Sequence, residues 1–419
     1  MTEAVAVVFY SSDHLRRVAG LALLEREVLA LRRGGVARVV VVVPGQERAA
    51  LEQWLLSSRL AADPPELLFA ADDSEGRAWA AAEEGIGSQT PALVLREPVA
   101  IDWGFVGGVL EALTEGRVTD GRTAAGGIAI CGSGLAGRAS GPELDERTFG
   151  GAAVAVQSAA DGRRARRALL AQSVKPLHID GIVCYLLIRR LSARLTTLML
   201  PLPITPNLVT GFSVVLGLAA AVAVGVGTYG WTVLGGSLLM LSLIFDSCDG
   251  EIARVKYRFS DWGAWFDIYG DLVVNSAFMA GMAVGAYRSF DQPLYLYTGA
   301  FAVFAVIFYN ATVFRYIHRL GIPDEFLFKW WFDLEAEAAA DGAPGAASEG
   351  EGPSAVGRFL SGLKYLGRRD FFIFAYLMTA IFGVLHWAFW ATVAGASMNF
   401  VMTCYQVFFW KGLPHGRAR

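Results

Sequence analysis

Four aspartates lie at regular intervals between two apolar segments in the middle of the chain. The stretch reads Asp246-x-x-Asp249-Gly250-x-x-Ala253-Arg254, then eight residues, then Gly263-x-x-x-Asp267-x-x-x-Asp271. The flanking segments, 231–245 and 272–286, are apolar enough to lie in a membrane. A charge that faced lipid there would cost roughly 2.5 to 3.5 kcal/mol. The carboxylates are therefore predicted to face one another or a cation.

Helical spacing would place these residues on two stripes that can face each other. Asp246 and Asp249 fall on one stripe, and Asp267 and Asp271 on the other, each with small residues beside them. Four carboxylates around one gap repel each other unless metal lies between them, and hard oxygen ligands favour Mg²⁺ or Mn²⁺ over Zn²⁺. The number of carboxylates allows two ions. A buried ion-pair network and the cation pathway of a transporter are the alternatives.

The pattern resembles the signature of the CDP-alcohol phosphotransferase (phosphatidyltransferase) family, D-x-x-D-G-x-x-A-R followed after about eight residues by G-x-x-x-D-x-x-x-D. The resemblance implies a transferase that moves a phospho-alcohol group from a CDP-alcohol donor to the hydroxyl of a second alcohol and releases CMP. It also implies that Asp246, Asp249 and Asp267 bind metal on the donor's pyrophosphate. Asp271 would complete the metal site and take the acceptor's proton.

The same resemblance assigns the nucleotide to the small and basic residues of the motif. These are Gly250, Ala253, Arg254 and Gly263, with Arg254 as a charge-assisted contact to phosphate.

Two further pairs of polar residues are weaker site candidates. Asn207 and Thr210 follow Thr205-Pro206 at the start of an apolar segment, where a Pro-Asn pair recurs in the family near the nucleotide, although a helix cap explains the pattern equally well. Arg315 and Arg319, at i and i+4, could bind an acceptor's phosphate or extend from a helix end toward the lipid headgroups. The basic pair before Asp370, Arg368-Arg369, stands at the start of another apolar segment.

Composition separates a water-soluble part from a membrane part. The 419 residues are 54% hydrophobic and 18% charged, but the first third is less apolar than the rest. A net charge of -3 argues against a nucleic-acid partner. The four cysteines are scattered without metal-ligand spacing, and the first residues lack the pattern of a signal peptide. We therefore expect reduced thiols and an N-terminus in the cytoplasm.

Residues 1–160 alternate short β-branched runs with helical patterns, which predicts a doubly wound, Rossmann-like α/β domain with a mainly parallel sheet. The expected strands are 4–10, 37–43, 66–70, 91–96, 126–130 and 152–157, and the expected helices include 13–33 and 47–60. His14 and the pair Arg16-Arg17 read as surface residues at a helix start.

The segment from Val18 to Arg26, with a helix that ends near Gly34-Gly35, resembles nucleotidyltransferases fused ahead of some family members, as in bifunctional inositol-phosphate cytidylyltransferase/di-inositol-phosphate phosphate synthases. Those enzymes hold a triphosphate on a glycine-rich loop. Residues 10–17 contain no glycine, and Arg96-Glu97-Pro98 stands where a metal-binding Asp is expected. The domain is therefore interpreted as a degenerate nucleotidyltransferase with a scaffold, regulatory or partner-binding role.

The rest of the chain is predicted to be a basic linker and interfacial amphipathic helix over 161–200 and a membrane domain over 201–419, with a disordered loop at 335–354. Six spans are expected at 206–227, 229–254, 261–287, 293–319, 370–388 and 391–411. Basic residues concentrate in the loops on one side, which predicts both termini and the Asp site at the cytoplasmic face of the inner or plasma membrane. The family resemblance also implies a homodimer.

Three functions remain open. The fused α/β domain favours the inositol-phosphate type of transferase, whereas the same motif also suits a CDP-diacylglycerol-dependent phosphatidyltransferase of phospholipid synthesis. The third is a transporter or scaffold, for which Asp271→Asn would leave function intact. The donor, the acceptor and the oligomeric state do not follow from the sequence.

Overall fold

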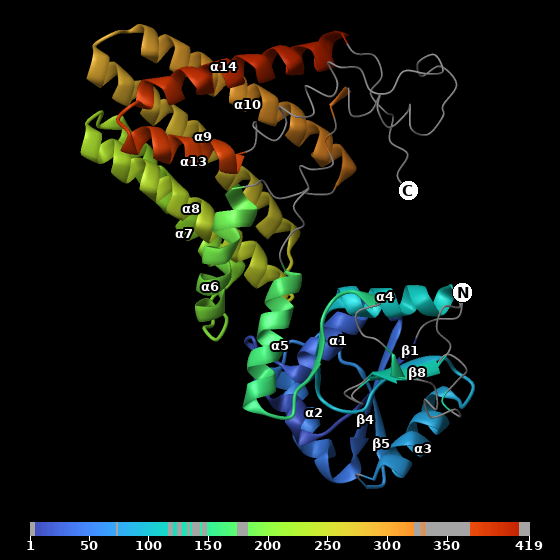
Figure 1. Cartoon of the computed structure of the whole chain (residues 1–419). Coiled ribbons are helices and arrows are strands. Elements are labelled where there is room, and N and C mark those ends of the chain that lie inside the picture. Colours follow the sequence, from blue (N-terminus) through green and yellow to red (C-terminus); the bar gives the residue numbers. More distant parts are fainter. Residues whose placement is uncertain are drawn as a thin grey trace. The chain divides into compact units, whose positions relative to one another are not determined.

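The computed structural model describes residues 5–72, 74–115, 120–123, 128–131, 135, 143–144, 149–173, 183–321, 328, 330, 331 and 369–409. The chain divides into two compact units, an α/β unit and a helical unit (Figure 1). The first unit comprises Met1–Val174 with two short stretches, Thr197–Pro203 and Arg254–Tyr257. The second comprises Lys175–Thr196, Ile204–Ala253 and Arg258–Arg419.

A seven-stranded sheet with the order β10-β8-β9-β6-β1-β4-β5 forms the centre of the first unit. Parallel pairings join β1 (Val5–Phe9) to β4 (Arg38–Pro44) and β6 (Ala92–Leu95), β4 to β5 (Glu66–Ala70), and β8 (Asp120–Thr123) to β10 (Glu143–Leu144). Strand β9 (Ile128–Cys131) runs antiparallel to β6 and β8. The prediction of an α/β domain with a mainly parallel sheet is confirmed.

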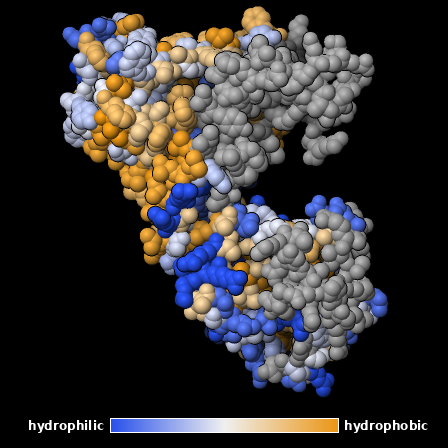
Figure 2. Space-filling model, viewed as in Figure 1, coloured by the Kyte–Doolittle hydropathy of each residue, from blue (hydrophilic) through white to orange (hydrophobic). Residues whose placement is uncertain are grey.

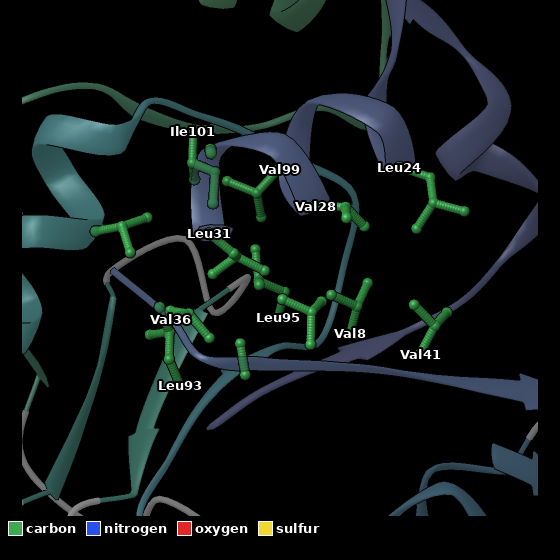
Figure 3. Close-up of a cluster of buried hydrophobic side chains, with 14 of the residues drawn as sticks. Val8, Leu24, Val28, Leu31, Val36, Val41, Leu93, Leu95, Val99 and Ile101 are labelled. Atoms are coloured by element: carbon green, nitrogen blue, oxygen red, sulfur yellow. The ribbon is translucent and has the colours of Figure 1, made fainter. Parts of the chain in front are cut away.

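Both faces of this sheet are buried, because alternate residues contribute to two apolar clusters. Along β1, Ala6 and Val8 belong to one cluster, and Val7 and Phe9 belong to the other. Helices α1 (Leu23–Arg33), α2 (Arg48–Ser57) and α4 (Trp103–Thr114) contribute to the first cluster, and α3 (Glu75–Ile86) contributes to the second. Figure 3 shows side chains of α1 meeting those of the strands in the first cluster.

Two small sheets complete the first unit. Strand β7 (Val99–Ile101) pairs with β11 (Ala153–Ala155), and β2 (Arg17–Val18) forms a hairpin with β3 (Leu21–Ala22). The predicted helix over 13–33 is therefore confirmed only for α1, and its first part is wrong, since a 3-10 helix (Ser12–Leu15) and this hairpin precede α1. Ala19 and Gly20 make the turn with φ of +52° and +84°, a conformation that glycine adopts without strain.

His14 is buried, which differs from the surface position that we expected. Its Nε2 lies 3.5 Å from the Glu27 Oε2, and neither side chain is exposed to solvent. Burial lowers the pKa of His14 to about 4 and raises the pKa of Glu27 well above its usual value of 4.5, although the backbone N–H of Val99, which donates to Glu27, partly opposes the second shift. His14 is therefore uncharged at neutral pH.

Residues 159–172 form a helix, α5 (Ala159–Gln172), where the sequence suggested the start of a linker. Ser158 caps it by accepting a hydrogen bond from the backbone N–H of Asp161. Ala165, Leu169 and Leu170 of α5 are buried in a cluster with residues of β2. This helix is therefore a folded part of the first unit.

The second unit is helical. Its long helices are α7 (Pro206–Gly225), α8 (Tyr229–Val255), α9 (Asp261–Phe290) and α10 (Leu294–Leu320), and its shorter ones are α6 (Arg189–Met199), α13 (Arg369–Ile381) and α14 (Leu385–Cys404). The four long helices are long and apolar enough to cross a membrane.

The structure does not establish the six predicted spans. The expected fifth and sixth spans, 370–388 and 391–411, fall on α13 and α14, which a turn at Gly383 with φ of +70° separates. Among the described residues, neither helix joins the four candidate spans. The predicted loop at 335–354 lies outside the residues that the structure describes.

Helices α7 and α9 pack closely because glycines stand at their crossing. A Cβ on Gly281 would overlap the backbone carbonyl of Ala221, and one on Gly285 would overlap that of Val224. Small residues that let two helix backbones approach are typical of helix pairs in membranes. This contact fixes the distance between α7 and the helix that carries Asp267 and Asp271.

The close packing can be tested with Gly281→Ala, which we expect to lower the free energy of unfolding by about 1–3 kcal/mol because the methyl group must separate the helices. Gly211→Ala on α7 is the control, since nothing lies within 4 Å of its added Cβ. That control should leave stability unchanged or raise it by up to about 1 kcal/mol. Thermal unfolding in detergent measures both, and a Gly281→Ala protein that melts at or above the wild-type temperature would contradict the packing.

The buried Glu27 predicts a dependence of stability on pH. Above pH about 4.5 the unfolded chain releases the Glu27 proton, whereas the folded chain keeps it. The contribution of Glu27 to the free energy of unfolding is therefore fully present below pH about 4.5 and is lost as pH rises. Glu27→Gln keeps an oxygen for the Val99 N–H without a titrating proton. Its melting temperature should fall less than that of the wild type between about pH 5 and about pH 8.

The exposed ion pair of Glu52 with Arg48 supplies the matched control, and Glu52→Gln should follow the wild-type curve. If the melting temperatures of Glu27→Gln and the wild type changed in parallel with pH, the folded chain would not keep a proton on Glu27 above pH about 4.5.

Candidate active site

Three of the four motif aspartates converge in the second unit. One carboxylate oxygen each from Asp246 on α8 and from Asp267 and Asp271 on α9 lie within 4.8 Å of one another. All three residues are partly buried. The two predicted stripes therefore meet, as the helical spacing required.

Asp249 lies one helical turn along α8 from Asp246 and is 6% exposed. The hydroxyl of Thr210, on α7, donates a hydrogen bond to its carboxylate. Thr210 is itself buried and also lies 3.2 Å from the carbonyl oxygen of Pro206. Thr210 therefore fixes the orientation of Asp249, which is outside the group of three converging carboxylates.

Arg369, at the start of α13, contacts the carboxylate cluster and was not among the predicted site residues. Its Nη1 donates to the carboxylate of Asp271 and lies 3.3 Å from Oδ2 of Asp246. Arginines are common at the ends of apolar helices, where their side chains extend toward the membrane surface. The sequence therefore gives only a weak signal that Arg369 contacts the carboxylates. The structure thus adds one cation to the carboxylate cluster.

The carboxylates have the oxygen ligands that a metal site needs, and one of these oxygens has an unmet need for a partner. The Oδ1 of Asp267 is buried and has no hydrogen-bond partner among the described residues. A buried carboxylate oxygen without a partner is unfavourable, and a hard divalent cation would satisfy it. These residues therefore fit Mg²⁺ or Mn²⁺.

A buried polar network fixes α8 from its other side. Glu251, between Gly250 and Ile252, accepts hydrogen bonds from Ser192 at 2.6 Å and from Thr196 at 2.7 Å, and forms an ion pair with Arg189 at 3.1 Å. All four side chains are buried. Glu251 therefore ties α6 to the motif helix, and Arg189, which lies in the stretch 161–200 where we expected an interfacial helix, is a buried ion-pair partner.

Asn207, at the start of α7, lies next to Gly263, at the start of α9. A Cβ on Gly263 would lie 2.7 Å from Oδ1 of Asn207 and 2.8 Å from Oγ of Ser260. The helix-cap alternative is also partly met, because Thr205 caps α7 by accepting a hydrogen bond from the Leu208 N–H. Only a glycine leaves space for the Asn207 amide here.

The other predicted residues are not all at the cluster. Gly250 and Ala253 share the motif face of α8, whereas Arg254 is part of the first unit, where its Nε donates to the carbonyl of Ser173 at 2.7 Å. Arg315 and Arg319 are exposed on α10, and no hydrogen bond or ion pair links either to another described residue. Their predicted role as acceptor ligands gains no support from the structure.

Part of the chain is similar to proteins of a known family. Residues 203–330, which include the four aspartates, match the CDP-alcohol phosphatidyltransferase family. The chain is also 32% identical over 154 residues to a protein of Thermococcus kodakarensis named bifunctional IPC transferase and DIPP synthase. It is 30% identical over 146 residues to the protein of that name from Aquifex aeolicus.

These matches are partial. The first covers 37% of this chain and 34% of the Thermococcus protein, and the second covers 35% and 33%, so the chain spans about a third of the length of these relatives. A crystal structure of Mycobacterium tuberculosis phosphatidylinositol phosphate synthase with CDP-DAG bound is similar over 55% of this chain and 100% of that one, with 15% identity and a TM-score of 0.35.

Metal binding by the cluster can be measured directly. Asp267→Asn should weaken Mn²⁺ binding by about tenfold or more, because it removes the charge from the carboxyl whose Oδ1 has no other partner among the described side chains and backbone groups. The matched control is Asp261→Asn, at the exposed first turn of the same helix, which should bind as the wild type does. Electron paramagnetic resonance of free Mn²⁺ in a titration gives the affinities, and equal affinities for the wild type and both variants would exclude the site.

Proposed function

We propose that this chain, whose residues 203–330 match the CDP-alcohol phosphatidyltransferase family, transfers a phospho-alcohol group from a CDP-linked donor to the hydroxyl of a second alcohol. CMP is the other product. The observation that carries this proposal is the convergence of Asp246, Asp267 and Asp271 within 4.8 Å, at the spacing that the family motif requires.

The metal is Mg²⁺ or Mn²⁺, and the carboxylates are numerous enough for two ions. Asp246, Asp249 and Asp267 would hold the metal, and Asp271 would complete the site. When bound, the metal neutralises the donor's pyrophosphate and polarises its phosphorus–oxygen bonds. Thr210 supports this site by fixing the Asp249 carboxylate.

Asp271 is the proposed general base. Its carboxylate takes the proton of the acceptor's hydroxyl while that oxygen forms a bond to the donor phosphorus distal to cytidine. The bond from this phosphorus to the bridging oxygen breaks, and CMP leaves with the electron pair. Arg369 lies against Asp271 and can donate hydrogen bonds to phosphate oxygens that come between them.

The nucleotide is proposed to lie along the small residues of the motif. Gly250, Ala253 and Gly263 present little side-chain bulk, and the amide of Asn207 beside Gly263 offers both a donor and an acceptor. Arg254 remains a proposed phosphate contact on the motif alone.

The first unit is proposed not to make the donor. A cavity of about 440 Å³ lies at the carboxyl ends of β1, β4, β5 and β6, where ligands of doubly wound sheets bind. Its charged lining consists of Glu47, Asp72, Glu97 and Arg96, an acidic balance that opposes a triphosphate. The 3-10 helix Ser12–Leu15 occupies the position of a glycine-rich loop. Both features support a degenerate nucleotidyltransferase.

The relatives named IPC transferase and DIPP synthase favour an inositol-phosphate acceptor with CDP-inositol as donor. The alternative is CDP-diacylglycerol as the donor, which the family description equally allows.

We further propose six membrane spans, with both termini and the Asp site on the cytoplasmic side, and a homodimer formed in the membrane. Crosslinking in membranes that yields only monomers would exclude the dimer.

The test is CMP release by the purified chain with Mg²⁺, with CDP-inositol or CDP-diacylglycerol as donor and inositol phosphate or glycerol phosphate as acceptor. We expect CMP from one donor and one acceptor only, and a loss of about a hundredfold or more in Asp271→Asn. With CTP and inositol phosphate in place of a CDP-alcohol, no pyrophosphate should appear.

Asp261→Asn serves again as the control and should keep full activity. CMP release that Asp271→Asn does not slow would remove Asp271 as the base. Retained function of an Asp271→Asn protein in cells, without CMP release by the wild type, would favour the transporter or scaffold.

A further inference from the structure

The first unit contains a hollow lined by arginines, away from the carboxyl ends of its main sheet. The hollow has a volume of about 430 Å³, and four of its lining residues are Arg16, Arg17, Arg163 and Arg166. This volume is within the range of about 300–1,000 Å³ that is typical of small-molecule sites. Among the described residues, no Asp or Glu lines the hollow.

Two elements far apart in the sequence bring these arginines together. Arg16 and Arg17 lie at the start of the β2–β3 hairpin, and Arg163 and Arg166 lie on α5, which packs against β2. The buried side chains of Val18 and Val156 contribute to the lining between them. The arginines are therefore held by a packed apolar cluster and do not project from a loose tail.

Among the residues that the structure describes, three of these arginines have no ion-pair partner. Arg16 forms an ion pair with Asp13 at 2.9 Å and donates to the carbonyl of Gln157. No ion pair or hydrogen bond connects Arg17, Arg163 or Arg166 to another described residue. Like charges at i and i+3 on one helix repel each other, as Arg163 and Arg166 must. An anion in the hollow would relieve this repulsion.

The N-terminus of α5 adds partial positive charge to the same place. Ser158, Ala159 and Gly162 from its first turn line the hollow. The first N–H groups of a helix attract anions, although Asp161 already occupies part of this end through its bonds to Ser158. Figure 2 shows a strongly hydrophilic patch over α5. Arginine is the side chain best suited to bind phosphate, because its planar fork forms two parallel hydrogen bonds.

We propose that this hollow is a phosphate-binding site, separate from the carboxylate cluster, that takes the phosphate of a small soluble molecule or of an anionic lipid headgroup. The shared chemistry is a phosphate group that Arg17, Arg163 and Arg166 contact together. The site goes beyond the proposed transferase reaction and does not depend on it.

The experiment compares two double variants of the full-length chain in nanodiscs of phosphatidylcholine. R163E/R166E changes two arginines that line the hollow, whereas R164E/R167E changes two exposed arginines on the same helix that do not line it. The two double variants have the same net charge. Isothermal titration with pyrophosphate, at constant ionic strength, should show binding that weakens by about tenfold or more only in R163E/R166E.

A second arm tests the lipid source, using nanodiscs that contain phosphatidic acid and native mass spectrometry of the lipid that remains bound. Loss of pyrophosphate binding or of bound phosphatidic acid in R163E/R166E alone supports the site and identifies its source. The single variant Arg17→Ala changes an exposed residue of the hairpin and leaves α5 intact. It should also weaken binding of the same probe, which would show that the loss does not come from misfolding of α5. Equal weakening in both double variants, or no binding of either probe by the wild type, would overturn the proposal.

Discussion

Carboxylates within an apolar helical unit are the constraint on which the candidate site depends. Asp246, Asp267 and Asp271 bring negative charges within 4.8 Å of one another, and such an arrangement is stable only if cations share the space. Arg369 supplies one cation, and Oδ1 of Asp267, which has no hydrogen-bond partner in the part of the chain that the structure describes, is free to bind a metal. The same carboxylates that are unfavourable in apolar surroundings therefore fit a divalent cation.

The surrounding helices serve this constraint by fixing the helices that carry the aspartates. Glycines let the backbones of α7 and α9 approach closely, and the Thr210 hydroxyl on α7 donates a hydrogen bond to the Asp249 carboxylate on α8. On the other side, Glu251 holds α6 against α8 through three polar contacts. Because these contacts are buried, they position the carboxylates before any substrate arrives.

Much of this could be predicted from the sequence, because periodicity reports which residues share a face. The helical spacing of the aspartates placed three of them together, and the apolar runs predicted five of the seven strands of the main sheet, all but β8 and β10. Contacts between distant segments have no such signal. Arg369 stands 98 residues after Asp271, and the ion pair of Arg189 with Glu251 joins residues that are 62 positions apart.

Local propensity misled at two places for a similar reason. Residues 13–33 have the apolar spacing of a helix, but the left-handed turn at Ala19 and Gly20 makes a hairpin first. The basic stretch after residue 160 has the composition of a linker, yet Leu169 and Leu170 give α5 a face that packs in the first unit. In both cases tertiary packing decided the structure, and packing partners cannot be read from one segment.

The most direct test of the central claim is pulsed electron-nuclear double resonance of Mn²⁺ bound to the purified chain with a CDP-alcohol. The proposed arrangement predicts ³¹P coupling from the donor's pyrophosphate to the carboxylate-bound Mn²⁺, and no such coupling when the donor is left out. Mn²⁺ that binds the chain but never shows ³¹P coupling would contradict a site in which these carboxylates hold the metal on the donor.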